Sequence, residues 1–379
     1  MLNHSMEHSV SASQPINLVK KNPFDKVYLI TLYLGNTCNF DCVYCDRGYI
    51  EDVGGQNVSR TNVDEMQEFF EWLETQPNEL KLVSFHGGEP LLFIKRMEQI
   101  MEWLYPIALR NGWKVTLTTN GSLVKENEWF FEKYNKILRA TVSYDFMYQA
   151  ENRAAFDVHE MAEVLNKYCD FWQWQFVMPI DHPKAFSFDN IKEIVNTCYK
   201  TNCKTINIIP LRHKRGKHKF DVIIDRINIP QFMDAFIQFI QILYIKKLNV
   251  FVDGCYTKID KAYFSEHHKL ILGPDGYMYP EFEFLEYRID AGRIGNWKTR
   301  QVWKNLGDKS RIRDGCLDCH KLHSCGLKYM YHLFDKEPEG HCKEFYTVMD
   351  YIMMHLDKLH EKKSFLEWVG INPDFEIEK

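Results

Sequence analysis

Cysteines at metal-ligand spacing are the most chemically informative residues of this 379-residue chain. Seven of its eleven cysteines are clustered, and clustered thiols in a long chain without a secretion signal favour metal or redox chemistry over disulfides. The first cluster comprises Cys38, Cys42 and Cys45. The second comprises Cys316, Cys319 and Cys325, with Cys342 following at a longer distance along the chain.

The first cluster can hold iron with one coordination position open. Three thiolates on one short loop can bind three irons of a cubane iron–sulfur cluster and leave the fourth iron without a protein ligand. Such clusters normally use four cysteines, so an open iron indicates a place for a substrate or cofactor. Zinc is the alternative, but structural zinc prefers four ligands and a C-x2-C spacing, and this loop has no fourth Cys or His nearby.

The second cluster has enough thiols for a closed site. Four thiolates satisfy either a zinc ion or an iron–sulfur cluster, and the spacing alone slightly favours zinc. A closed cluster could relay electrons or stabilise a small domain with a thin core. Outside both clusters, Cys169, Cys198 and Cys203 lie on or beside expected helices, and we interpret them as buried thiols.

Short apolar runs alternate with amphipathic helical patterns from residue 26 to about residue 248, which predicts an α/β fold with a parallel sheet. The strands read as apolar on both faces, which is typical of a sheet covered on both sides. An open doubly wound sheet and a partial barrel share this pattern, and both place active sites at the carboxyl ends of the strands. The expected strands are Val27–Leu34, Leu80–Phe85, Lys114–Thr119, Leu138–Ser143, Gln173–Met178 and Thr205–Ile209.

Two segments flank this α/β region. Residues 1–25 are polar and aperiodic, so we expect a flexible tail and no separate leader-binding domain before the first strand. The alternation stops near residue 249, where we place a domain boundary. Residues 249–379 are then expected to form a small cysteine-rich domain with a final helix near Phe345–Leu356.

Composition narrows the functional classes. Hydrophobic residues make up 45% and charged residues 26% of the chain, which is typical of a globular protein. A net charge of −5 gives no general reason to bind nucleic acid or an anionic membrane. No stretch has the length of a signal peptide's apolar region or of a membrane helix, so we expect a cytoplasmic protein.

Around the first cysteine cluster the chain resembles the radical S-adenosylmethionine (SAM) superfamily. The family signature is C-x3-C-x2-C with an aromatic residue before the last cysteine, here Tyr44. Three further motifs follow the expected strands in the family's order, and the resemblance covers roughly residues 26–248. These motifs are His86–Pro90 with the sequence HGGEP, Thr118–Gly121, and Ser143–Asp145 with Arg153 shortly after.

The resemblance implies a partial (β/α)6 barrel and SAM chemistry. The open iron of a [4Fe–4S] cluster would bind SAM, and an electron from the cluster would cleave it to methionine and a 5′-deoxyadenosyl radical that takes hydrogen from the substrate. Ser143 would bind the ribose and Arg153 the carboxylate of SAM, while Tyr44 would lie against the cofactor. Glycines at the methionine end would allow close backbone approach. The further SAM-binding residues implied by the motifs are Gly87, Gly88, Glu89 and Asn120.

The second cysteine cluster resembles the SPASM domain, a cluster-binding extension of peptide-modifying radical SAM enzymes. This resemblance favours one auxiliary [4Fe–4S] cluster on the four clustered thiols over zinc. The family expects further cysteines where this chain has Glu281 and Tyr329. Cys255 is either a free buried thiol, a cluster ligand or a substrate-facing group. Glu281 is a surface acid, a rare cluster ligand, or a catalytic proton acceptor beside the substrate.

The leading hypothesis is therefore a radical SAM enzyme that modifies a peptide or protein by crosslinking, thioether formation, epimerisation or residue oxidation. It would need an external electron donor such as flavodoxin or ferredoxin. A small metabolite is the alternative substrate, and the basic stretch Arg212–Lys219 would then hold a phosphate instead of an acidic peptide, unless it is simply a solvated loop. A non-catalytic iron–sulfur or zinc protein is the third hypothesis.

Overall fold

The structure is a computed structural model in which most of the α/β region is described. The described residues are 24–25, 27–42, 45, 62–179, 186–211, 213–216, 219–222, 238–243, 245–252, 268–280, 285, 290–299, 301–302 and 306.

A largely parallel sheet organises the described residues. Six strands pair side by side in chain order, as the sequence predicts: β1 (Val27–Tyr33), β2 (Leu82–His86), β3 (Lys114–Thr119), β4 (Leu138–Ser143), β5 (Trp172–Pro179) and β6 (Thr205–Leu211). Two unpredicted strands extend the sheet in parallel, β9 (Asn249–Val252) beside β6 and β10 (His268–Leu272) beside β1. Short antiparallel strands β11 (Tyr277–Tyr279) and β12 (Gly292–Arg293) follow β10. The sheet therefore continues past residue 249.

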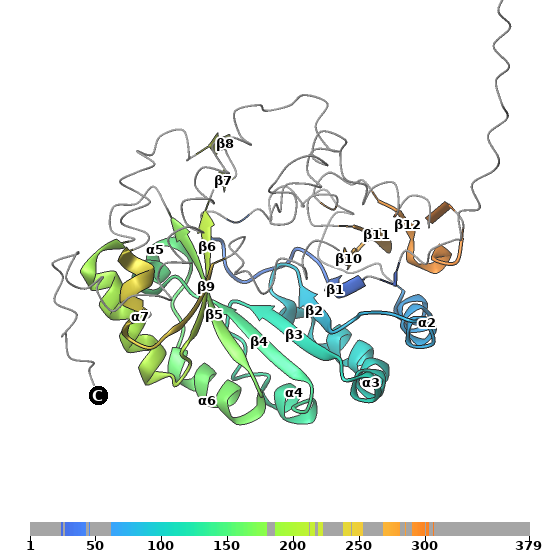
Figure 1. The fold of residues 1–379 in the computed structure, drawn as a ribbon, viewed down its shortest axis with the longest axis horizontal. Coiled ribbons are helices and arrows are strands. Elements are labelled where there is room, and N and C mark those ends of the chain that lie inside the picture. Colours follow the sequence, from blue (N-terminus) through green and yellow to red (C-terminus); the bar gives the residue numbers. More distant parts are fainter. Residues whose placement is uncertain are drawn as a thin grey trace, which may run out of the picture.

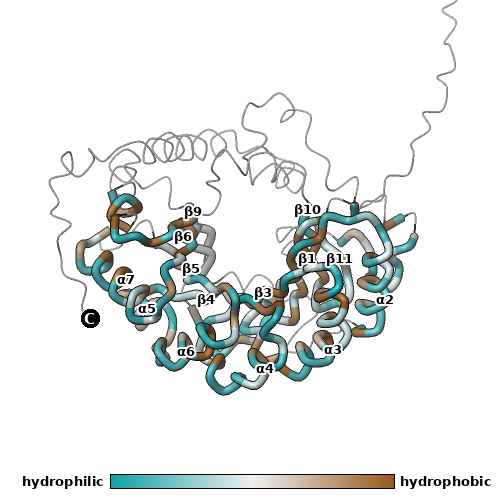
Figure 2. Tube along the Cα trace, turned by 60° about the horizontal axis from the view of Figure 1, so that its bottom comes forward, coloured by the Kyte–Doolittle hydropathy of each residue, from teal (hydrophilic) through white to brown (hydrophobic). Residues whose placement is uncertain are grey.

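The arrangement is a partial barrel and not a doubly wound sheet. A doubly wound sheet reverses its strand order at a switch point, whereas β1 to β6 follow one another without a switch. The parallel strands form an arc whose two ends are β9 and β10, and the helices lie along its outside (Figures 1 and 2). The concave side of the arc is thus the inside of an open barrel.

The two faces of the sheet differ in polarity. Residues on the outer face, such as Val83, Leu117 and Trp174, are fully buried against the helices. Alternate residues point to the inner face, and there the strands bear Ser, Thr, Gln and Asn among apolar residues such as Leu82, Val177 and Ile209. The expectation that the strands are apolar on both faces is therefore wrong for the inner face. Its polar residues include Ser84, Thr116, Thr141, Gln173, Gln175 and Asn207.

The outer helices begin and end at the residues that their capping chemistry favours. They are α2 (Val63–Glu74), α3 (Ile94–Asn111), α4 (Glu128–Lys133), α6 (Val158–Tyr168) and α7 (Phe188–Lys200). Asn62 caps α2, because its side chain accepts a hydrogen bond from the backbone nitrogen of Asp64. Asp157 and Ser187 cap α6 and α7 in the same way. Gly112 ends α3 in the left-handed conformation.

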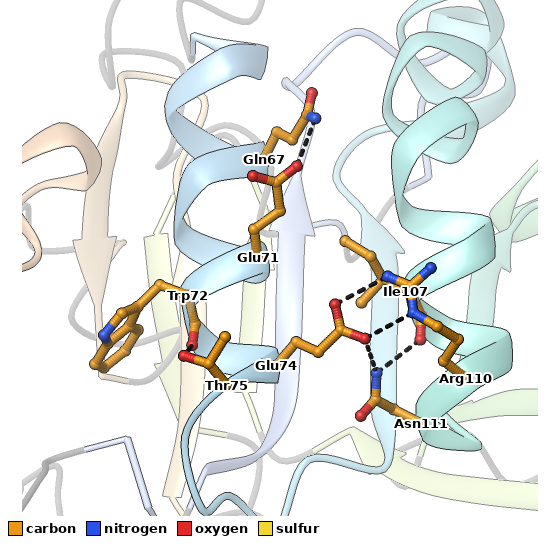
Figure 3. A network of polar contacts seen from close by, with 8 residues as sticks. All are labelled: Gln67, Glu71, Trp72, Glu74, Thr75, Ile107, Arg110 and Asn111. Carbon is orange, nitrogen blue, oxygen red and sulfur yellow. Dashed lines mark hydrogen bonds and ion pairs between the residues drawn. The ribbon is translucent and has the colours of Figure 1, made fainter.

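Helices α2 and α3 are joined on the surface by an ion pair (Figure 3). Glu74 at the end of α2 accepts hydrogen bonds from Nε and Nη2 of Arg110, both at 2.9 Å, and one from Asn111 at 2.8 Å. The Arg110 side chain is 59% exposed. Because solvent screens such a pair, we expect it to contribute little to the stability of the fold.

An aromatic cluster attaches both ends of the described chain to α2. Trp297, which follows the short helix η5 (Ile294–Asn296), is buried with its ring centre 4.2 Å from that of Trp72 and 5.7 Å from that of Phe69. Phe24 is also buried against Phe69 and Trp72. The tail expected over residues 1–25 therefore ends before Phe24.

Several expected features lie outside the described residues. They are the final helix near Phe345–Leu356, the tail before Phe24, and most of residues 249–379. The basic stretch is described only in part, where β7 (His213–Gly216) and β8 (Lys219–Val222) pair as an antiparallel hairpin. Within the part of the chain that the structure describes, no helix is long and apolar enough to cross a bilayer.

Candidate functional site

The first cysteine cluster lies on the loop that follows β1, at the carboxyl edge of the sheet. Cys38 and Cys42 are partly buried and Cys45 is exposed. The backbone nitrogen of Cys45 donates to the carbonyl of Cys42 at 3.1 Å. Tyr44 lies outside the described residues.

The two glycines after β2 let that loop lie directly against the cysteine loop. A Cβ on Gly88 would come within 2.2 Å of the carbonyl oxygen of Thr37, and one on Gly87 within 2.4 Å of that of Gly35. The backbone nitrogen of Gly88 donates to Gly35, and that of Glu89 to Thr37, both at 2.8 Å. The glycines thus hold two loops together within the chain, a role separate from the predicted contact with the cofactor.

Glu89 binds the loop after β3. Its side chain is fully buried, and one carboxylate oxygen accepts from Thr119 Oγ1 at 2.8 Å and from the backbone of Leu91 at 3.0 Å. The other oxygen accepts from the backbone nitrogen of Asn120 at 2.7 Å. Burial raises the pKa of Glu89, while these hydrogen bonds and the charge of Arg153 oppose the rise. Glu89 therefore fixes the end of β3 relative to β2.

Asn120 in turn binds the cysteine loop. Its Nδ2 donates to Asn39 Oδ1 at 2.8 Å and to Cys38 Sγ at 3.8 Å. Its Oδ1 accepts from the backbone nitrogen and the hydroxyl of Ser122. The amide has two N–H groups and two lone pairs, so contacts within the chain already use its side-chain hydrogen-bonding capacity.

Ser143 and Arg153 come from the end of β4 and the residues after it. The Ser143 hydroxyl accepts from Gln175 Nε2 of β5 at 3.3 Å, which leaves the serine proton available for donation. Nε of Arg153 donates to Cys42 Sγ at 3.3 Å. Nη1 of Arg153 lies 4.0 Å from Oδ1 of Asp145, a fully buried residue. Burial raises the pKa of the Cys42 thiol, and Arg153 opposes that rise.

Two polar side chains of the site, Gln175 and His86, have no role in the sequence-based prediction. Gln175 could have been found, because it lies opposite Ser143 once the strands are aligned in parallel register. His86 belongs to the HGGEP motif but was given no role. Its Nδ1 accepts from the Gly87 backbone at 2.9 Å, and burial lowers the pKa of His86 to about 4, so the imidazole is neutral at pH 7.

The structure brings one set of sequence-predicted residues together and does not describe another. The cysteine loop, the glycine pair, Glu89, Asn120, Ser143 and Arg153 all come from the carboxyl ends of β1 to β4 or the loops after them. The residues outside the described part are Tyr44, Cys255, Glu281, Cys316, Cys319, Cys325 and Cys342.

The surroundings of the thiols on the loop after β1 are compatible with an iron–sulfur cluster. In a cubane each thiolate binds a different iron. Two of the sulfurs receive hydrogen bonds of the kind that stabilise such ligands. The donors are Asn120 and the backbone of Phe40 for Cys38, and Arg153 for Cys42.

Comparisons with known proteins agree with an iron–sulfur site on this loop. The family model described as Radical SAM superfamily matches residues 32–227. A 7-carboxy-7-deazaguanine synthase of Methanocaldococcus jannaschii is 30% identical over 105 residues, which are 25% of this chain and 40% of that relative. The match therefore spans less than half of the curated relative's length.

Solved structures share the fold over most of the chain. The anSMEcpe structure with bound AdoMet and Cp18Cys peptide has a TM-score of 0.62 at 15% identity and covers 89% of this chain and 99% of that one. Streptococcus suis SuiB bound to S-adenosylmethionine has a TM-score of 0.59 at 15% identity and covers 83% and 75%. SuiB bound to its precursor peptide SuiA has a TM-score of 0.56 at 17% identity. At such identities the likeness shows the fold.

Proposed function

Because the chain belongs to the radical SAM superfamily, we propose that it is an enzyme that binds a [4Fe–4S] cluster through Cys38, Cys42 and Cys45 and cleaves SAM reductively. When bound and reduced, the cluster supplies the electron that breaks SAM into methionine and a 5′-deoxyadenosyl radical. The observation that carries the proposal is the three-thiol loop at the carboxyl edge of the partial barrel, with hydrogen-bond donors directed at two of its sulfurs.

The chain's own groups have distinct roles in this proposal. The cysteine loop is held in place by the backbone bonds from Gly88 and Glu89 and by Asn120. Ser143, oriented by Gln175, presents its hydroxyl proton to the SAM ribose. The polar inner face of the sheet provides hydrogen-bonding groups for the substrate and the adenosine. The division of the chain into residues 26–248 and 249–379 remains part of this proposal, and strands β9 to β12 of the second segment extend the sheet of the first.

We propose a peptide or protein as the substrate, and one auxiliary [4Fe–4S] cluster on Cys316, Cys319, Cys325 and Cys342. The fold shared with anSMEcpe and SuiB, whose structures contain peptides, supports the substrate class. An external flavodoxin or ferredoxin would reduce the cluster. The proposed modification is crosslinking, thioether formation, epimerisation or residue oxidation. Glu281 is the candidate proton acceptor beside the substrate.

A small metabolite is the second candidate substrate. It is favoured by the local sequence match to a 7-carboxy-7-deazaguanine synthase, although that match covers a quarter of this chain. The two substrate classes lead to different products, so one assay can separate them.

The test is anaerobic incubation of the full chain with SAM and dithionite, in the presence of short peptides encoded beside its gene or of purine-like metabolites. We expect 5′-deoxyadenosine in every mixture and, in a peptide, a mass change or, for an epimerisation, a changed chromatographic retention at unchanged mass. A mass change confined to a metabolite would support the second candidate.

Cys42→Ala should abolish the formation of 5′-deoxyadenosine, because it removes a proposed cluster ligand. Cys169→Ala is the matched control, since this thiol packs against the hydrophobic core away from the cysteine loop. Equal formation of 5′-deoxyadenosine by wild type and Cys42→Ala would contradict the proposal.

A further inference from the structure

Arg153 contacts one of the clustered thiols from a distant part of the chain. Its Nε donates to Sγ of Cys42 at 3.3 Å although the two residues are 111 positions apart. The Arg153 side chain is only 10% exposed. A guanidinium carries its positive charge at any physiological pH, so this contact places a fixed, largely desolvated charge beside the sulfur.

The surrounding residues hold Arg153 in this position. Its backbone nitrogen donates to the carbonyl of Gln149 at 2.9 Å, at the end of the short helix α5 (Gln149–Asn152). The Gln149 side chain accepts from the backbone of Asp145 at 2.9 Å and donates to the carbonyl of Ala154 at 2.7 Å. Gln149 thus fixes the chain on both sides of Arg153. The Asp145 carboxylate attracts the guanidinium through Nη1, away from the Nε that contacts Cys42.

We infer that Arg153 is a positioning residue that raises the reduction potential of the cluster bound by Cys38, Cys42 and Cys45. This inference rests on the proposed function. Taking up one electron from an external donor makes the cluster more negative, so a nearby cation stabilises the reduced form more than the oxidised form. Hydrogen bonds to cluster sulfurs act in the same direction. The low exposure of Arg153 strengthens both effects, because little water screens the charge.

This role differs from the SAM carboxylate contact that the sequence motif implies. A guanidinium has five N–H donors, so a bond from Nε to Cys42 is compatible with a second bond to a carboxylate. The two roles are separable because they differ when SAM is absent. A residue that only binds SAM leaves the potential of the SAM-free cluster unchanged, whereas a donor to Cys42 changes it.

The experiment is an anaerobic redox titration of the full chain without SAM, followed by electron paramagnetic resonance. The signal that changes when SAM is added afterwards identifies the cluster under study and separates it from an auxiliary cluster. The variants are Arg153→Gln, which removes the charge, and Arg153→Lys, which keeps the charge but lacks Nε. Arg110→Gln is the matched control, because Arg110 is an exposed arginine that pairs with Glu74 on the outer helices.

We expect Arg153→Gln to make reduction at least about tenfold less favourable, which corresponds to a shift of about 59 mV to lower potential for one electron. Arg153→Lys should shift the potential less and in the same direction, and Arg110→Gln should leave it unchanged. If Arg153→Gln loses the cluster, Arg153→Lys tests the inference instead: a shift to lower potential supports it, and an unchanged potential contradicts it.

Unchanged potentials combined with weaker SAM binding would overturn the inference and leave the proposed function standing. A wild-type chain that binds no cluster would instead overturn the proposed function itself.

Discussion

Gly88→Ala should loosen the loop that bears the proposed cluster ligands. The new Cβ would lie 2.2 Å from the carbonyl oxygen of Thr37 and 2.5 Å from that of Asn36. Ordinary contacts begin near 3.4 Å, and both neighbours are backbone atoms, so the two loops must separate by roughly 1 Å. The bonds from Gly88 to Gly35 and from Glu89 to Thr37, both 2.8 Å long, would then exceed hydrogen-bonding distance.

The loss of stability in Gly88→Ala follows from the loss of these two hydrogen bonds. Each contributes roughly 0.5–1.5 kcal/mol net, so we expect a loss of about 1–3 kcal/mol in the free energy of unfolding. Because the displaced backbone leads directly into Cys38, the variant should also release iron to a chelator faster than wild type. Urea unfolding and the rate of iron release measure the two effects.

Gly112→Ala provides the matched control. Its Cβ would meet nothing within 4 Å, but its φ of +67° disfavours any residue with a side chain. This variant should lose about 1–2 kcal/mol of stability, because a residue with a Cβ is disfavoured in the left-handed conformation, and it should release iron at the wild-type rate. If Gly88→Ala behaves like Gly112→Ala, the glycine pair does not hold the cysteine loop, and the reasoning is refuted.

Three further predictions concern the neighbouring groups. Asn120→Ala removes the donor to Asn39 and Cys38 and should speed iron release to a chelator, whereas an unchanged rate would show that this amide does not hold the loop. Trp297→Ala should cost about 3–5 kcal/mol in urea unfolding, because it empties the cluster on α2, and a loss below 1 kcal/mol would argue against that docking. Folding lowers the pKa of His86 from 6.5 to about 4 through burial. Between these pH values the unfolded chain therefore binds a proton that the folded chain does not, and stability should fall on acidification by at most about 3 kcal/mol. The stability of His86→Gln should fall less on acidification. Equal profiles of unfolding free energy against pH for wild type and His86→Gln would show that His86 does not cause the fall.

The sequence predicted the barrel strands well because each is bounded by clear turn signals and has a strongly apolar outer face. Lys114–Thr119 and Leu138–Ser143 match the structure at both ends. It did not predict β9 and β10, since each has only four or five residues and neither is followed by a helical pattern. The pairing of β10 with β1 joins residues far apart in the chain, which local periodicity cannot reveal.

The sequence predicted the residue types of the site better than their contacts. The cysteine spacing and the order of the motifs pointed to one edge of the sheet, where the structure places the described members. The contacts within the chain were not predictable, because they depend on which loops meet. Glu89 faces Thr119 and Asn120, and Asn120 faces Cys38, only once β1, β2 and β3 pair in that order.

The most direct measurement of the central claim is the electron paramagnetic resonance spectrum of the reduced chain, recorded anaerobically before and after SAM is added. If three thiolates leave one iron free to accept SAM, the spectrum of a [4Fe–4S] cluster should be present and should change on addition of SAM, and Cys42→Ala should lack the responsive signal. A spectrum with no cubane signal, or one that SAM leaves unaltered, would contradict the account.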